Sequence, residues 1–212
     1  MRYKTSTEYW LDPENMTLRG KFDEMYQDLE DPWDCLGKST KKHKRLLCEL
    51  LSNDRGYGSI LDVGCGLGGF TKIMSDRNGS ARVVGCDISE TAIGKARNLY
   101  PSLRFEVKNV LSDDFADLES PFDLIVVSEV LWYVLDDLGG VFEKLSRALA
   151  SSGVLALQQY FPDNQQFGRQ VIDGLGGFES FVRNGTDLKM TEKVVCFEQN
   201  DGVVLLASLQ KK

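Results

Sequence analysis

The sequence predicts an α/β protein built on a doubly wound, mostly parallel sheet, with a helical cap at its N-terminal end. Two observations carry this prediction. From about residue 59 onward, apolar runs of strand length alternate with segments of helical length. Near the end, "DLKMTEKVVCFEQNDGVVLLASL" places two β-rich runs around a hairpin signal at Asp201-Gly202. Alternating elements of this kind give parallel strands joined by right-handed crossovers, with helices on both faces.

The predicted parallel strands are the apolar runs "SILDV", "ARVVGCDIS", "LRFEVKNV", "FDLIVVSEV" and "VLALQQY". The fourth run has no polar alternation, which is typical of a strand that is covered on both faces. Helices are predicted between the runs, at "FTKIMSDRNG" and at "ETAIGKARNLY". A further helix follows the fourth strand, because Leu138, Phe142, Leu145 and Leu149 recur at helical spacing before Gly153.

The first part of the chain has a different character. It mixes aromatic residues with carboxylates, Pro13 and Pro32 interrupt it, and "KKHKRLLCELL" at its end is typical of an amphipathic helix. We predict that residues 1–57 form a helical cap over the sheet, not an independent domain, and that residues 58–212 form the main, ligand-binding domain. The basic "KKHKR" is either an anion site or, as is more common, the solvated face of a helix.

Composition argues against several classes of partner. Lys and Arg number 25 and Asp and Glu number 32, which gives a net charge of −7. An acidic chain is poorly suited to a nucleic-acid backbone, although charge can be segregated on a surface. The N-terminus lacks the apolar core of a signal peptide, and the apolar stretch 124–135 is too short to span a bilayer. We therefore expect a cytoplasmic protein without a membrane span and without a nucleic-acid partner. We also expect a monomer or homodimer whose partner is a small molecule.

Cysteine and histidine usage argues against a metal site. The chain has five cysteines without a C-x-x-C pair, and a single histidine, His43. Neither a structural zinc site nor a histidine-based triad is expected from such a set, so we expect no metal and reduced, mostly buried thiols.

The stretch "ILDVGCGLGGF", residues 60–70, follows the first predicted strand. Through Gly64, Gly66 and Gly69 it fits the pattern G-x-G-x-x-G. Alone, the pattern is compatible with a dinucleotide site, with another nucleotide-like cofactor, or with a simple turn. Ligands of doubly wound sheets bind beyond the carboxyl ends of the strands, so the residues at those ends discriminate among the three.

Those strand ends carry residues suited to a nucleoside with a cationic group. Asp62 precedes the glycines and would repel a pyrophosphate but suit an ammonium or sulfonium; alternatively it caps the next turn. Asp87 can accept both hydroxyls of a ribose; alternatively it caps the next helix, a role that Ser89 fits better. Ile88 can pack against an adenine face.

The third and fourth strand ends continue the series. Asn109 and Val110 stand where an adenine edge would be read, and Ser128 and Glu129 open a loop onto the same crevice. Nucleoside binding is the common explanation for all four strand ends.

Three of these stretches resemble a known family. "LDVGCGLGGF", "VVGCDIS" and "FDLIVVSEVLWYV" are similar to the successive motifs of class I S-adenosylmethionine-dependent methyltransferases, over roughly residues 59 to 209. Together with the upstream "DPW", the last stretch resembles the nodulation protein S-like N-methyltransferases, which act on an amino-sugar oligosaccharide. The resemblance implies a Rossmann-like, seven-stranded sheet with an antiparallel last strand, S-adenosylmethionine as cofactor and S-adenosylhomocysteine as product.

The resemblance also implies residue roles. Gly64 and Gly66 would line the methionine moiety, with Asp62 near its amine, and Asp87 would bind the ribose. The adenine would be surrounded by Ile88, Asn109 and Val110, with Ser128 and Glu129 also at the cofactor. Many relatives carry an aspartate in place of Asn109 and a histidine in place of Tyr133, so a histidine base is not available here.

Methyl transfer needs a neutral nucleophile, so a proton acceptor is expected near the methyl group. Glu129 and Tyr133 are the catalytic candidates, in that order. Glu129 can instead hydrogen-bond to loop backbone or to the cofactor's amine, and Tyr133 can instead pack in the core. Trp33, Trp132 and Tyr160 are the substrate candidates. Trp33 fits a hydrophobic anchor for the cap better, and Trp132 can instead pack in the core.

The acceptor itself is not encoded in a readable motif. We expect residues 1–57 and 160–178 to select it. Three functions remain open: a methyltransferase acting on an amine or hydroxyl of a small molecule, plausibly an amino sugar; an NAD-dependent oxidoreductase; and a non-catalytic nucleoside binder.

Overall fold

A seven-stranded sheet runs through the centre of the molecule, in the order β5-β4-β3-β6-β7-β9-β8. The computed structural model describes residues 5–34, 36, 47, 51, 56–198 and 202–212. The basic cluster 41–45, most of the helix predicted around it, and Asp201 of the predicted turn lie outside the described residues. The strands are β3 (Ser59–Val63), β4 (Arg82–Asp87), β5 (Arg104–Val107), β6 (Phe122–Ser128), β7 (Leu149–Pro162), β8 (Leu188–Glu198) and β9 (Gly202–Lys211).

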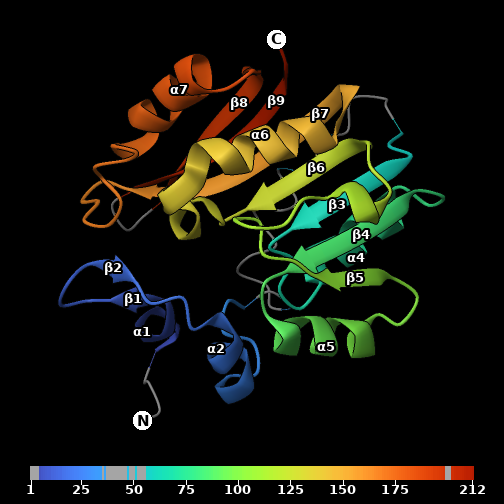
Figure 1. Ribbon diagram of the computed structural model, residues 1–212, viewed down its shortest axis with the longest axis horizontal. Helices are drawn as coiled ribbons and strands as arrows, with labels where there is room; N and C mark the ends of the chain where they lie inside the picture. Colours follow the sequence, from blue (N-terminus) through green and yellow to red (C-terminus); the bar gives the residue numbers. More distant parts are fainter. Residues whose placement is uncertain (1–4, 35, 37–46, 48–50, 52–55, 199–201) are drawn as a thin grey trace.

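The strand directions confirm the predicted topology. β3 to β7 pair in parallel, whereas β9 is antiparallel to both of its neighbours, β7 and β8. The strand order reverses between β3 and β6. Because these strands are parallel, the carboxyl ends of β3, β4 and β6 face one side of the molecule (Figure 1). β7 begins earlier than predicted, because Leu149 pairs with Phe122 across a bulge before Val154 resumes the ladder opposite Leu124.

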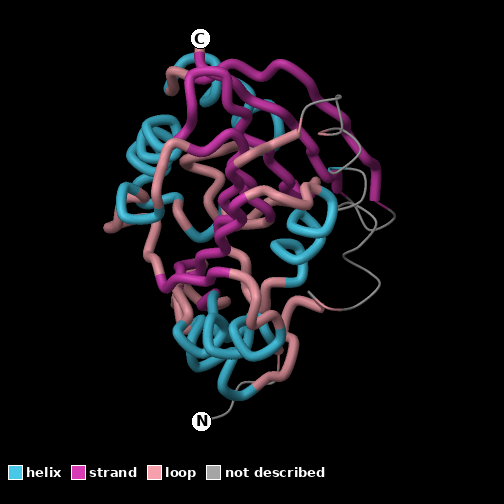
Figure 2. Tube along the Cα trace, turned by 90° about the vertical axis from the view of Figure 1, so that its right-hand side faces the viewer, coloured by secondary structure: helices cyan, strands magenta, loops and turns pink. Residues whose placement is uncertain are grey.

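Helices cover both faces of the sheet, as predicted (Figure 2). On one face lie α4 (Gly69–Arg77) and α5 (Glu90–Leu99), and on the other lie α6 (Leu138–Ala148) and α7 (Gly174–Gly185). Short 3-10 turns occur at η1 (Ala116–Leu118), η2 (Leu131–Tyr133) and η3 (Leu135–Asp137). None of the helices in the described part of the chain is long and apolar enough to cross a membrane.

β6 shows why the fourth apolar run lacks polar alternation. Successive side chains of a strand point to opposite faces, so both faces of a buried strand must be apolar. Leu124 and Val126 pack into the cluster that contains α4, and Ile125 and Val127 pack into the cluster that contains α6. All four are nearly or completely buried, which fixes the strand at the centre of the fold.

The N-terminal segment lies at the carboxyl ends of the strands (Figure 1). It comprises α1 (Ser6–Trp10), β1 (Leu11–Asp12), β2 (Thr17–Leu18) and α2 (Phe22–Asp28), and we call residues 5–34 the cap. The cap is tied to α5 by polar contacts. Asp23 Oδ1 accepts hydrogen bonds from Ser89 Oγ and from the Thr91 amide, both at 2.8 Å, and Lys95 Nζ donates to the carbonyl of Tyr26 at 2.6 Å.

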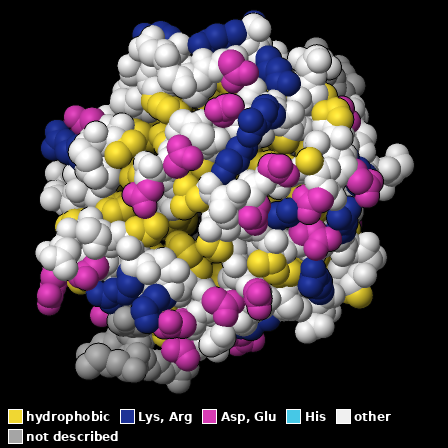
Figure 3. Space-filling view, in the orientation of Figure 1, with side chains coloured by type: hydrophobic (Ala, Val, Ile, Leu, Met, Phe, Trp, Pro, Cys, Tyr) yellow, Lys and Arg dark blue, Asp and Glu magenta, His cyan; other side chains and the backbone are white. Residues whose placement is uncertain are grey.

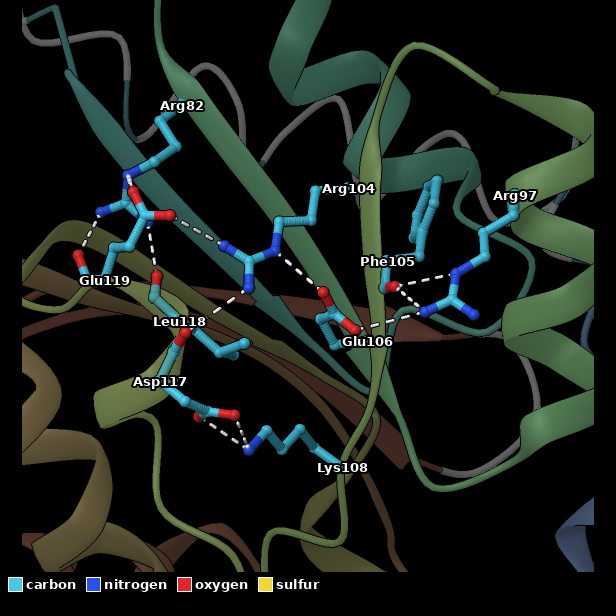
Figure 4. A network of polar contacts seen from close by, with 9 residues as sticks. All are labelled: Arg82, Arg97, Arg104, Phe105, Glu106, Lys108, Asp117, Leu118 and Glu119. Atoms are coloured by element: carbon cyan, nitrogen blue, oxygen red, sulfur yellow. Dashed lines mark hydrogen bonds and ion pairs between the residues drawn. The ribbon is translucent and has the colours of Figure 1, made fainter.

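The edge at β5 is covered by a charged network (Figure 4). Arg104 pairs with Glu106 on its own strand at 2.9 Å and with Glu119 at 3.1 Å, and Arg97 of α5 also reaches Glu106 at 3.2 Å. Arg82 donates to the carbonyl of Glu119 at 2.6 Å. These contacts hold the segment after η1 along the edge strand, and charged side chains on an edge discourage pairing with another sheet.

The two glycines at positions 68 and 94 should respond oppositely to replacement by alanine. Gly68 precedes α4 at φ +76°, and a Cβ there would lie 2.6 Å from the buried ring of Phe105. Gly94 is exposed on α5, with nothing within 4 Å of the added methyl group. We expect Gly68→Ala to lower the free energy of unfolding by about 2–4 kcal/mol. Gly94→Ala should raise it by about 0.5–1 kcal/mol. Urea unfolding of both variants measures this, and equal effects would contradict the described contacts.

Asp23→Ala should loosen the cap, because it removes both hydrogen bonds to α5. Burial raises the pKa of Asp23, but the hydrogen bonds from Thr91, Ser89 and Gln27 outweigh it, so the net pKa is lowered. The ionised carboxylate therefore stabilises the cap above the ordinary aspartate pKa, and this is lost as the pH falls through the lowered value. At pH 7 we expect a loss of about 1 kcal/mol and faster limited proteolysis within residues 5–34.

Glu30→Ala is the matched control, because Glu30 is exposed on the cap. It should leave both measurements unchanged. Proteolysis of Asp23→Ala at the wild-type rate would show that the cap is held by its apolar contacts alone.

Candidate functional site

A cavity of about 240 Å³ lies between the strand ends and the cap. In the orientation of Figure 1, hydrophobic side chains gather around a hollow on the side toward which the strands point, with acidic side chains among them (Figure 3). The predicted site residues that line the cavity are Trp33, Asp62, Gly64, Asp87, Ile88, Asn109, Val110, Ser128, Glu129 and Tyr133. Gly66, Trp132 and Tyr160 are not among the residues that line it. Nor are any of residues 160–178.

The glycine loop folds back onto the end of β4. The amides of Gly64 and Cys65 both donate to the Cys86 carbonyl, at 2.8 and 3.0 Å, and the Gly66 amide donates to Asp87 Oδ2 at 2.9 Å. Gly64 has φ +73°, and a Cβ there would strike the side chain of Val130. Glycine is therefore needed at position 64 by both the backbone and the space. The amides of Gly64, Cys65 and Gly66 therefore bond to β4 and are not available to cradle a phosphate.

Asp87 ends β4 with its carboxylate held in place. Oδ1 accepts from the Ser89 amide at 3.0 Å, opposite the bond from Gly66 to Oδ2. Burial raises the pKa of the Asp87 carboxyl, although the amides of Ser89, Gly66 and Ile88 act in the opposite direction. Ser89 is the N-cap of α5, since its side chain accepts from the Ala92 amide. The helix cap and the candidate ribose acceptor are thus different residues.

Asp62 is 2% exposed and bridges β3 to α4. Its Oδ2 accepts a hydrogen bond from Thr71 Oγ1 at 2.6 Å. The carboxylate is therefore fixed in the cavity wall by a side-chain hydroxyl.

Asn109 follows β5 and forms a tight turn. Its Oδ1 accepts from the Leu111 amide at 3.0 Å, and its own amide donates to Asp113 Oδ2 at 2.9 Å. The side-chain amide nitrogen is the part of Asn109 that can meet a ligand. Beside it, Lys108 donates to both carboxylate oxygens of Asp117 at 2.7 Å (Figure 4). That hydrogen bond raises the pKa of Lys108.

Glu129 follows β6 in an unusual conformation, with φ +58°. A non-glycine residue in this region costs about 1–2 kcal/mol, so the surrounding contacts must enforce it. The carboxylate accepts from Gln158 Nε2 at 3.3 Å, from Gln159 Nε2 at 3.0 Å and from the Tyr160 amide at 3.1 Å. All three donors belong to β7, so the neighbouring strand orients the side chain.

Tyr133 is the centre of an aromatic cluster between η2 and the cap. Its ring meets Trp10 at 5.2 Å and Phe22 at 5.0 Å, both edge to face, and Trp33 at 6.2 Å between ring centroids. Phe22, Trp33 and Tyr133 also line the cavity. This cluster joins the cap to the main domain and supplies an apolar wall.

The side chains of Trp132 and Tyr160 pack against other parts of the protein and do not line the cavity. Trp132 Nε1 donates to the Tyr160 carbonyl at 3.1 Å, and its ring packs edge to face on Phe161. The ring of Tyr160 packs against the core cluster on the α4 face of the sheet. Gln158, which sequence reasoning missed, does line the cavity and contacts Glu129. No spacing in "VLALQQY" distinguishes the glutamine that faces the cavity.

The cavity wall is acidic. Its described side chains include three carboxylates, those of Asp62, Asp87 and Glu129, and one cation, Lys108, which is already paired with Asp117. Among the described residues no group of His, Cys, Asp and Glu side chains is arranged to hold a metal ion. Cys65 and Cys86 are both buried, and burial together with the nearby Asp62 and Asp87 raises the pKa of Cys86.

Residues 61–155 match a family model described as a methyltransferase domain. The chain is 37% identical over 133 residues to a malonyl-[acyl-carrier protein] O-methyltransferase of Acetivibrio thermocellus, covering 60% of this chain and 45% of that protein. It is 36% identical over 107 residues to a trans-aconitate 2-methyltransferase of Variovorax paradoxus, covering 50% of this chain and 39% of that protein. The chain thus spans less than half the length of these relatives.

Among solved structures, the fold is similar to that of the N-methyltransferase NodS from Bradyrhizobium japonicum WM9 in complex with S-adenosylhomocysteine. The TM-score is 0.74 at 23% identity, covering 90% of this chain and 97% of NodS. Together with the family match, the seven-stranded sheet and its antiparallel strand confirm the expected resemblance. The chain therefore has the class I methyltransferase fold, and its residues 61–155 match the methyltransferase domain.

Proposed function

We propose that this protein transfers the methyl group of S-adenosylmethionine to the nitrogen of a small amine, with amino sugars as the leading candidates. The observation that carries the proposal is the charge of the cavity. Three carboxylates line it, and its one described cation is neutralised by Asp117. Such a wall suits the sulfonium and ammonium groups of the cofactor and a second ammonium on the acceptor.

The topology divides the cavity between cofactor and acceptor. Asp87, Ile88 and Asn109 follow β4 and β5, on one side of the point where the strand order reverses. We assign the nucleoside to that side, with the ribose hydroxyls on Asp87, the adenine beside Ile88, Asn109 and Val110, and the methionine end near Gly64 and Asp62. The other side, over β6 and β7, is left for the acceptor.

The hydrogen bonds of the glycine loop argue against the alternative of an NAD-dependent oxidoreductase. A dinucleotide fingerprint offers backbone amides to a pyrophosphate. Here the amides of Gly64, Cys65 and Gly66 already donate hydrogen bonds to the end of β4. In addition, the carboxylates of Asp62 and Asp87 would repel the phosphates. The methyltransferase match over residues 61–155 supports the same choice.

The charge also separates this protein from relatives whose names specify acidic acceptors. Trans-aconitate carries several carboxylates, and a site for it needs cations that are available to pair with them. No such cation lines the described wall beyond the paired Lys108. An amine acceptor, as opposed to a carboxylate, is the better fit.

The cofactor supplies the methyl group on a good leaving group, so the protein's part is to position, desolvate and deprotonate. Glu129 lies over β6, oriented by three donors from β7, and is our candidate for taking the proton of the acceptor ammonium. Tyr133 lines the same cavity and, with Trp33 and Phe22, excludes water from the acceptor side. A hydroxyl acceptor would use the same groups.

Asp87→Ala should weaken the binding of S-adenosylhomocysteine at least tenfold, through the loss of one or more charge-assisted hydrogen bonds. Because the pKa of Asp87 is raised, wild-type affinity should fall on acidification at a pH above the ordinary aspartate range, and the variant should lack this step. Isothermal titration measures both. Asp136→Ala, an exposed carboxylate, is the control. Unchanged affinity in Asp87→Ala would mean that the ribose lies elsewhere.

Glu129→Gln should lower turnover by about a hundredfold while changing cofactor affinity little, because a glutamine cannot accept the proton. A screen of amines, amino sugars and phenols with labelled S-adenosylmethionine identifies an acceptor for this measurement. The exposed Glu143→Gln is the control. If affinity falls and turnover at saturation survives, Glu129 is a cofactor ligand only. Cofactor binding without turnover of any acceptor would favour the non-catalytic binder.

A further inference from the structure

Gln158 carries a buried hydrogen-bond acceptor that has no partner among the described residues. The residue sits on β7 opposite Ser128 of β6, is 5% exposed and lines the cavity. Its Nε2 donates to Glu129 Oε1 at 3.3 Å, but its Oε1 is buried and receives no hydrogen bond from any residue that the structure describes. Buried polar atoms are nearly always satisfied, so an orphan acceptor in a cavity wall indicates a missing donor.

The orientation of this side-chain amide follows from Glu129. A carboxylate can only accept, so an amide turned the other way would set its oxygen against the oxygens of Glu129. Glu129 thereby fixes Gln158 with its nitrogen inward to the carboxylate and its carbonyl directed elsewhere. Since Gln159 Nε2 and the Tyr160 amide hold Glu129 independently of Gln158, the direction of the Gln158 carbonyl is built into the fold.

The position of Gln158 points to the acceptor and not to the nucleoside. β7 lies on the far side of β6 from β3 and β4, which carry the glycine loop and Asp87. Within the same cavity stand the rings of Phe22, Trp33 and Tyr133, and aromatic faces attract cations. A carbonyl acceptor, a carboxylate and aromatic rings together match a cation that bears an N–H group.

We propose that the Gln158 carbonyl accepts a hydrogen bond from the N–H of the substrate amine, and that it makes Gln158 a specificity-determining residue for amines over carboxylates and over cations without N–H. The proposal rests on the proposed function and names the group that recognises its substrate. A carboxylate in the same place would set its oxygens against those of both Gln158 and Glu129. A quaternary ammonium would leave the carbonyl unsatisfied.

The test uses binding to the full chain saturated with S-adenosylhomocysteine. The probes are glucosamine and benzylamine, which carry N–H, benzyltrimethylammonium, which is a cation without N–H, and benzoate. Gln158→Met removes the carbonyl at similar side-chain volume, whereas Gln158→Glu keeps an acceptor oxygen. The control is Gln170→Met, which replaces an exposed glutamine by methionine. Thermal unfolding checks that each variant is folded, and titration of S-adenosylhomocysteine is the second readout.

We expect Gln158→Met to weaken binding of both amines by about tenfold, the usual effect of losing a charge-assisted hydrogen bond. Its affinities for benzyltrimethylammonium and S-adenosylhomocysteine should stay within about twofold of wild type. Gln158→Glu should bind the amines at least as well as wild type, because a proton shared between the two adjacent carboxyl groups replaces the Nε2–H donor and leaves the other oxygen as an acceptor. This variant keeps the test decisive if Gln158→Met does not fold. Benzoate should bind the wild type more weakly than either amine.

Five results would overturn the inference. Amine binding that is equal in wild type and Gln158→Met, or lost in a folded Gln158→Glu, would remove the carbonyl's role. Failure of the wild type to bind either amine would remove the amine subsite, while intact binding of S-adenosylhomocysteine would leave the cofactor assignment standing. A tenfold loss of S-adenosylhomocysteine affinity in Gln158→Met would reassign the carbonyl to the cofactor. A wild type that binds no S-adenosylhomocysteine would overturn the proposed function itself.

Discussion

The arrangement of the site depends on how the loop after β3 is tied to the end of β4. Three consecutive amides, of Gly64, Cys65 and Gly66, donate to the Cys86 carbonyl or to the Asp87 carboxylate. These bonds bring two strand ends into one wall and orient Asp87 toward the cavity. Because these three amides are already hydrogen-bonded, they are not available to bind a phosphate. A glycine pattern that is shared with dinucleotide sites therefore serves here to hold two strand ends together.

The cap completes what the sheet begins. Asp23 reaches the first turn of α5 through Ser89 and Thr91, and Ser89 in turn donates its amide to Asp87. The cap is thus one hydrogen-bonded residue away from the candidate ribose acceptor. On the other side of the cavity, Trp10, Phe22 and Trp33 gather around Tyr133. The cap is therefore attached to the main domain by polar contacts at α5 and by aromatic contacts at Tyr133. The cavity lies between the cap and the sheet because both attachments keep the cap in place.

β7 shapes the side of the cavity that we assign to the acceptor. Gln158, Gln159 and the Tyr160 amide converge on Glu129, whose left-handed backbone they help to maintain. Strain of this kind is retained where the surrounding contacts over-determine it, and it is common at functional sites. Among the described residues, the same contacts leave the Gln158 carbonyl without a donor. The strand thus supplies both the orientation of a carboxylate and a hydrogen-bond acceptor in the cavity wall.

The sequence alone determined the sheet and the line of candidate cofactor residues. Apolar runs such as "FDLIVVSEV" specify a doubly covered strand, and parallel strands bring their carboxyl ends to one edge, so Asp62, Asp87, Asn109 and Glu129 were predicted to share a crevice and do line one cavity. These inferences need only periodicity and chain direction. Long-range side-chain contacts are not encoded that way.

Only the tertiary structure decided which side chains of neighbouring pairs face the cavity. It packs Trp132 and Tyr160 against the core, and it bonds the side-chain carbonyl of Asn109 to the amide of Leu111 in its own turn. It places Gln158 in the cavity wall, whereas Gln159 donates a hydrogen bond to Glu129. Adjacent residues in "QQY" differ only in which face of β7 they occupy, and that depends on the register with β6 and β9. Pairing across strands far apart in the chain, and not local pattern, sets that register.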